Sequence, residues 1–242
     1  MKKFIVILTS LLILFNPVYA NKYGIFTPQN YTYDSNAGEE LLFILDLSNS
    51  MNEPLENDTK FNLMLKTMNE ILPKISPLTR VGLRIYGYKM GFTPMEACRA
   101  STLATPIKEN NSSNIRFALT KRKPRGMTPI TFSLKQAIKY DFAGFGGKKH
   151  IILMTDGGEN CDESPCAFVM ELIKFRRDVQ IDVIAFNIKD SDDLEQLKCT
   201  ALVTSGKFYN AQTSAQLIDG FNKSIDGVKN VEAKIILPNF NK

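Results

Sequence analysis

Three short segments of this 242-residue chain carry side chains whose oxygens suit a hard divalent cation. The first segment holds Asp46, Ser48 and Ser50, and alternate residues of an extended segment point to the same side. The second segment offers the hydroxyl of Thr128, and the third offers the carboxylate of Asp156. Ligand sets made only of oxygen are typical of Mg²⁺, Mn²⁺ or Ca²⁺ rather than zinc.

Each of these residues also has an ordinary structural interpretation. Ser48 and Ser50 are common turn and helix-capping residues, and Thr128 precedes Pro129, which favours the first turn of a helix. Asp156 precedes two glycines, as many turn residues do. A metal site is therefore indicated only if the fold brings the three segments together.

The segment before Asp46 is a continuous apolar run at residues 41–45, which is typical of a strand buried on both faces of a parallel sheet. Residues 150–154 repeat this pattern and lead to Thr155 and Asp156. Similar patterns predict four further strands and six helices. The predicted strands are 81–86, 102–107, 179–186 and 207–210, and the predicted helices are 59–72, 115–120, 129–140, 165–177, 191–204 and 213–228.

This alternation predicts an α/β domain, doubly wound, with a mostly parallel six-stranded sheet and helices on both faces. Ligand sites in such sheets lie at the carboxyl ends of the strands, where strand order reverses. The three oxygen-rich segments follow strands or begin helices, so we expect them to meet at that edge.

The order of these residues along the chain resembles the metal-ion-dependent adhesion site of von Willebrand factor type A (VWA) domains. The pattern is Asp46, Ser48 and Ser50, then Thr128, then Asp156. The resemblance covers about residues 39–230. The stretches RVGLRIYGY, PRGMTPITFSLKQA and HIILMTDGGENC look like those of bacterial secreted members. The resemblance implies a Rossmann-like VWA fold in which the three hydroxyls surround the metal and the two carboxylates act largely through waters and hydrogen bonds.

Such a site leaves a divalent charge incompletely neutralised, because its hydroxyls are neutral and only two carboxylates are available. Mg²⁺ takes about six oxygens and keeps several waters, so an open position can accept an Asp or Glu of a partner protein. We therefore expect a metal-dependent protein-binding module that uses Mg²⁺, with Mn²⁺ or Ca²⁺ as alternatives, and not an enzyme.

Two other functions stay open at this stage. One is a structural envelope protein whose metal site is unoccupied. The other is a Mg²⁺-dependent hydrolase, for which Glu159 is the only nearby candidate base. No Gly-rich phosphate loop occurs, and His150 begins its strand at the end of the sheet away from the site.

The two ends of the chain carry separate expectations. Residues 1–20, with Lys2 and Lys3 before an apolar run, have the parts of a signal peptide, which predicts a secreted or periplasmic protein. Residues 21–38 read as an extended lead-in, and residues 231–242 as an edge strand or a tail, with the apolar stretch at 233–237. No later run is apolar enough to predict a membrane span in the mature chain.

The composition excludes several classes of protein. Apolar residues at 44% and charged residues at 23% are ordinary for a globular domain and exclude a collagenous or wholly disordered chain. The net charge of +5 is too small and too dispersed to indicate nucleic-acid binding.

Four cysteines behind a signal peptide predict two disulfides, for which three pairings exist. Cys161 and Cys166 form the obvious local pair, which leaves Cys98 with Cys199. The strand order that the VWA resemblance implies favours a different pairing, Cys98–Cys161 with Cys166–Cys199.

Overall fold

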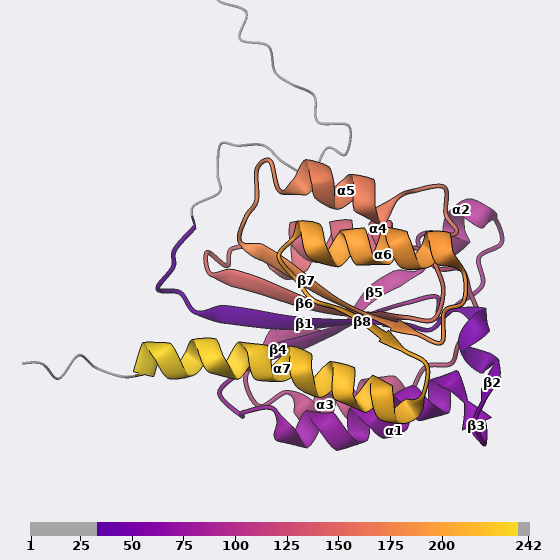
Figure 1. Cartoon of the computed structure of the whole chain (residues 1–242), viewed down its shortest axis with the longest axis horizontal. Helices are drawn as coiled ribbons and strands as arrows, with labels where there is room; N and C mark the ends of the chain where they lie inside the picture. Colours follow the sequence, from indigo (N-terminus) through magenta and orange to yellow (C-terminus); the bar gives the residue numbers. More distant parts are fainter. Residues whose placement is uncertain (1–32, 237–242) are drawn as a thin grey trace, which may run out of the picture.

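Six strands form a central sheet in the order β5-β4-β1-β6-β7-β8 (Figure 1). The structure is a computed structural model that describes residues 33–236. All neighbouring strands run parallel except β5, which pairs antiparallel with β4. The strands are β1 (Glu39–Asp46), β4 (Arg80–Tyr86), β5 (Ser101–Lys108), β6 (Lys148–Thr155), β7 (Val179–Phe186) and β8 (Phe208–Ala211). This confirms the predicted α/β class, the mostly parallel sheet and its six strands.

Helices cover both faces of the sheet in separate layers (Figure 1). One layer holds α1 (Lys60–Ile71), α3 (Ser112–Thr120) and α7 (Ser214–Ile236). The other holds α4 (Ile130–Gln136), α5 (Pro165–Leu172) and α6 (Ser191–Val203). A π-helical turn (Ala137–Asp141) continues α4. Smaller elements are η2 (Asn49–Asn52), β2 (Pro54–Leu55), β3 (Asp58–Thr59), η3 (Leu72–Lys74) and α2 (Pro94–Ala97).

The central strand β1 shows why its sequence is apolar throughout. Leu41, Phe43 and Leu45 pack into the core beneath α1, α3 and α7, whereas Leu42 and Ile44 pack into the core beneath α4, α5 and α6. All five side chains are fully buried. Successive residues of a strand point to opposite faces, so a strand with a helical layer on each side must be apolar at every position.

The end of the chain corrects one prediction. Residues 233–237 were expected to form an edge strand or a tail, but α7 continues as a helix to Ile236. Residues 228–236 contain neither proline nor glycine, and Pro238 is the first helix-breaking residue after them. Ile235 and Ile236 therefore belong to the helix.

Some predictions concern residues outside the described range. The predicted signal peptide, residues 21–32 of the predicted lead-in and residues 237–242 all lie there. Within the described range, no helix combines the length and the hydropathy that crossing a bilayer requires.

Candidate metal centre

The segment from Asp46 to Ser50 and the segment that carries Thr128 meet at the carboxyl edge of the sheet. Asp46 is the last residue of β1, and Ser48 forms an isolated parallel bridge with Gly126. Asn49 N–H donates to Gly126 O at 2.9 Å. The contact requires glycine nearby, because a Cβ on Gly87 would lie 2.5 Å from Ser48 N. Gly87 also has a φ of +70°, which L side chains rarely adopt.

Asp46 is fully buried beneath the site and organises the backbone around it. Its Oδ1 accepts a hydrogen bond from Ser48 N–H at 2.6 Å, and its Oδ2 accepts one from Thr155 Oγ1 at 2.8 Å. Burial and the nearby charge of Asp156 raise the pKa of Asp46 to about 7, against the effect of these hydrogen bonds. Burial is thus the larger cause of the raised pKa of Asp46, and the second is repulsion from the neighbouring carboxylate.

Asp156 joins the first segment to the third. Ser50 Oγ donates to Asp156 Oδ1 at 2.7 Å, and Ser48 Oγ lies 3.5 Å from the same oxygen. The two serine hydroxyls are 3.0 Å apart. Burial raises the pKa of Asp156, although Lys60 and Ser50 oppose that effect. Two hydroxyls and a carboxylate oxygen thus converge on a common point.

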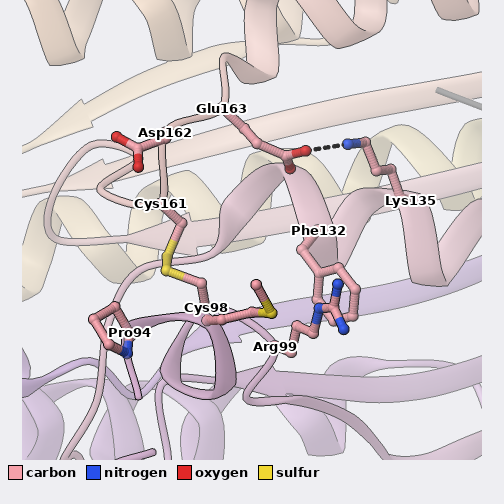
Figure 2. A pocket seen from close by; sticks show the side chains of 9 residues that line it. Pro94, Cys98, Arg99, Phe132, Lys135, Cys161, Asp162 and Glu163 are labelled. Atoms are coloured by element: carbon pink, nitrogen blue, oxygen red, sulfur yellow. Dashed lines mark hydrogen bonds and ion pairs between the residues drawn. A yellow bond between two sulfur atoms is a disulfide. The ribbon is translucent and has the colours of Figure 1, made fainter. Parts of the chain in front are cut away.

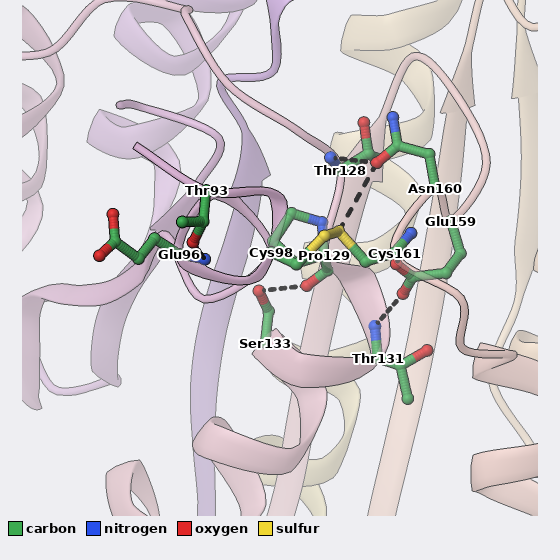
Figure 3. The surroundings of a disulfide bond; sticks show 10 residues. All are labelled: Thr93, Glu96, Cys98, Thr128, Pro129, Thr131, Ser133, Glu159, Asn160 and Cys161. Carbon is green, nitrogen blue, oxygen red and sulfur yellow. Dashed lines mark hydrogen bonds between the residues drawn. A yellow bond between two sulfur atoms is a disulfide. The ribbon is translucent and has the colours of Figure 1, made fainter. Parts of the chain in front are cut away.

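Thr128 lies on the same cavity, of about 490 Å³, as Ser50 and Asp156. Its backbone N–H donates to Asn160 Oδ1 at 2.7 Å (Figure 3). Its hydroxyl makes no hydrogen bond to another residue in the described part of the chain, although Thr128 is only 4% exposed. That oxygen is therefore available to a ligand in the cavity.

Lys60 and Glu53 also line this cavity, although no sequence pattern indicated them. Lys60 Nζ lies 3.0 Å from Asp156 Oδ2 and 2.7 Å from Glu53 Oε2. Burial alone would lower the pKa of Lys60, but the two carboxylates outweigh it and raise the pKa. No local sequence signal identifies Lys60, because its place depends on how α1 packs against the loop after β6.

Glu159, the candidate base of the hydrolase alternative, has a structural role here. Its Oε2 accepts Thr131 N–H at 2.7 Å (Figure 3), and its Oε1 accepts Cys161 N–H at 3.0 Å. Burial nevertheless raises its pKa, because it outweighs these hydrogen bonds. Glu159 thus fastens the loop after β6 to the beginning of α4. His150 lies in β6 at the level of Leu41, near the opposite edge of the sheet, as predicted.

The donor set fits a hard divalent cation. Within residues 33–236, no group of three or more His, Cys, Asp or Glu side chains is arranged to hold a metal, so a metal here depends on hydroxyl ligands. Ser48, Ser50 and Thr128 would supply these hydroxyls, beside the two carboxylates whose pKa values are raised. Added positive charge would relieve the repulsion between those carboxylates.

The four cysteines form two disulfides. Cys98 pairs with Cys161, and Cys166 pairs with Cys199, which is the pairing that the VWA resemblance favoured. Cys98 follows α2 in the loop between β4 and β5, and Cys161 follows Asn160, which holds Thr128 (Figure 3). A second cavity, of about 620 Å³, adjoins the Cys98–Cys161 bond (Figure 2).

Comparison with known sequences identifies a matching protein family and distantly related proteins. The sequence profile of the von Willebrand factor type A domain matches residues 40–223. The uncharacterized protein YwmC of Bacillus subtilis (strain 168) is 26% identical over 192 residues, which cover 78% of this chain and 83% of YwmC.

Solved structures give a similar fold. Proximal thread matrix protein 1 from the mussel byssus, with a zinc-occupied MIDAS motif, has a TM-score of 0.57 at 22% identity, over 83% of this chain and 47% of that one. The pilus adhesin SpaC from Lactobacillus rhamnosus GG, in its open conformation, has a TM-score of 0.58 at 14% identity, over 83% of this chain and 31% of that one. This chain thus spans less than half of either structure, and at these identities the likeness concerns the fold.

Proposed function

Because the chain belongs to the von Willebrand factor type A family, we propose that it is a protein-binding module that captures an acidic side chain of its partner through a divalent cation. The family assignment alone does not name a ligand. The proposal rests on the chemistry of the five oxygen-bearing residues, Asp46, Ser48, Ser50, Thr128 and Asp156.

The observation that carries the proposal is the presence of neutral hydroxyls beside the carboxylate of Asp156. Ser48 Oγ and Ser50 Oγ are 3.0 Å apart, and Ser50 lines the same cavity as Thr128. A cation bound there would supply an electrophilic position, since neutral hydroxyls leave most of its charge uncompensated. A carboxylate is the protein side chain that best completes such a shell.

The donor set also bears on the metal. Oxygen ligands alone favour Mg²⁺, with Mn²⁺ or Ca²⁺ as alternatives, over zinc, which usually takes nitrogen or sulfur ligands. The mussel protein named above has zinc in its MIDAS motif, so zinc belongs in any titration of this chain. A preference for Mg²⁺ would distinguish this site from that one.

An oxidising compartment suits the chain, which we propose to be secreted or periplasmic. Its four cysteines form two disulfides, and such bonds persist mainly outside the cytosol. The pilus adhesin and the byssal matrix protein named above share the fold. The predicted signal peptide at residues 1–20 agrees with this proposal.

A binding role is favoured over catalysis because both carboxylate oxygens of Glu159, the candidate base, already accept hydrogen bonds from backbone amides. A hydrolase needs a group free to accept a proton beside the metal. A structural envelope protein would leave the metal site unoccupied, and a metal titration separates that function from the one proposed.

The test is binding of a glutamate-containing peptide to the purified mature chain, measured with Mg²⁺ and again with EDTA. We expect binding with Mg²⁺, no binding with EDTA, and none by Thr128→Ala in either condition. Thr120→Ala, at an exposed helix end, is the matched control and should behave as wild type. Equal peptide affinity with and without Mg²⁺ would contradict the proposal.

A further inference from the structure

Lys60 lies in an unusual place for a lysine. It is the first residue of α1, where the helix dipole disfavours a positive charge, and its side chain is only 6% exposed. Neither the helix nor solvent therefore explains its position. Burying an ammonium group is costly unless it is paired, so its partners must account for it.

Those partners are carboxylates of the candidate metal centre. Lys60 Nζ lies 3.0 Å from Oδ2 of Asp156, a side chain with no exposed surface, and 2.7 Å from Oε2 of Glu53. The backbone reinforces the second contact, because Lys60 N–H donates to Glu53 O at 3.0 Å. Lys60 is thus held to the site by both its main chain and its side chain.

The two oxygens of Asp156 are divided between two kinds of partner. Oδ1 accepts a hydrogen bond from Ser50 and faces the hydroxyls, whereas Oδ2 faces the ammonium group. Lys60 therefore already supplies one positive charge to a carboxylate that a metal would also use. A cation that enters the site meets both a partly neutralised Asp156 and a like charge close by.

We infer that Lys60 is an internal cation of the site, which competes with the metal for the charge of Asp156 and so limits the affinity for metal. The inference rests on the proposed function, because it concerns the same site. It adds a role for a residue outside the five-residue pattern. The affinity for metal is then set by a balance between the hydroxyl-rich shell and the ammonium group behind Asp156.

The test is calorimetric titration of the purified mature chain with Mn²⁺. Lys60→Met keeps an unbranched side chain of similar length without charge and should raise the affinity for Mn²⁺ at least tenfold. Lys60→Arg keeps the charge and should stay within threefold of wild type. Lys66→Met is the matched control, because Lys66 lies on the same helix and pairs with Asp58 at 2.7 Å, away from the cavity.

The removal of a buried charge can disturb folding, so each variant is first checked by circular dichroism and thermal unfolding. If Lys60→Met does not fold, Lys60→Gln replaces it, because its amide can still donate a hydrogen bond to Asp156. The same increase in affinity for Mn²⁺ is expected from Lys60→Gln.

The outcomes separate this inference from the proposed function. If wild type and Lys60→Met bind Mn²⁺ equally, or if Lys66→Met shows the same increase, Lys60 has no special role, and the proposed metal site stands. If only the variants that lack the charge, Lys60→Met and Lys60→Gln, bind, the inference holds, and wild type does not use the metal as proposed. If none of them binds, both are wrong.

Discussion

The disulfide Cys98–Cys161 should stabilise both the fold and the metal centre, and the second disulfide offers a matched comparison. Cys98 and Cys161 are 63 residues apart in sequence, and Cys166 and Cys199 are 33 apart. Loop-closure entropy for lengths of this order predicts a contribution of about 4 kcal/mol to the free energy of unfolding from each bond. Removal of either bond should therefore cost similar stability.

Their effects on metal binding should differ. Cys161 directly follows Asn160, whose Oδ1 accepts a hydrogen bond from the backbone N–H of Thr128 at 2.7 Å. Ordering a loop costs about 1–2 kcal/mol per residue, and 1.4 kcal/mol corresponds to a tenfold change in affinity. If loss of the tether frees even one residue of this loop, the Cys98→Ser/Cys161→Ser variant should bind Mn²⁺ about tenfold more weakly.

The assay pairs urea unfolding with calorimetric titration of Mn²⁺ for both double variants. We expect Cys166→Ser/Cys199→Ser to lose comparable stability but to keep the wild-type affinity for metal, because that bond joins α5 to α6 away from Thr128. Equal losses of affinity in both variants would show a general effect of destabilisation. An unchanged affinity in Cys98→Ser/Cys161→Ser would refute the tether.

Two other predictions concern the fold away from the metal centre. His150 is buried within 3.2 Å of Glu39 and 3.3 Å of Asp182, and although burial lowers its pKa, the two carboxylates outweigh this and raise it. Because its pKa is higher in the folded than in the unfolded chain, protonated His150 stabilises the fold fully below about pH 6.5, and this stabilisation is lost as pH rises through the folded pKa. Urea unfolding should therefore show a loss of stability above pH 6.5 in the wild type. The His150→Gln variant should not show this loss. Phe221→Ala should cost about 3–5 kcal/mol without a change in affinity for Mn²⁺, because Phe221 is fully buried against Phe43 with ring centroids 6.0 Å apart; a loss below 1 kcal/mol would contradict that packing.

The central strands β1 and β6 could be predicted from sequence because they are buried on both faces. The predicted segments 41–45 and 150–154 lie inside β1 and β6, each of which extends two residues further at its beginning and one residue further at its end. The end of α7 could not be predicted in the same way, because a short apolar run such as residues 235–237 is compatible with either a strand or a helix. Only the absence of a helix-breaking residue before Pro238 favoured the helix.

The candidate site was predictable only in part. Asp46, Ser48 and Ser50 are close in sequence, and their order relative to Thr128 and Asp156 carries the family pattern. Lys60 was not predictable, because a lysine early in a helix ordinarily lies in solvent. Its contact with Asp156 depends on packing between segments 96 residues apart.

The most direct test of the account is a crystal structure of the chain grown with Mn²⁺, with an anomalous difference map to locate the ion. We expect one strong peak within coordination distance of the hydroxyl oxygens of Ser48, Ser50 and Thr128. A peak elsewhere, or no peak at an Mn²⁺ concentration that saturates binding in solution, would contradict the assignment of this site.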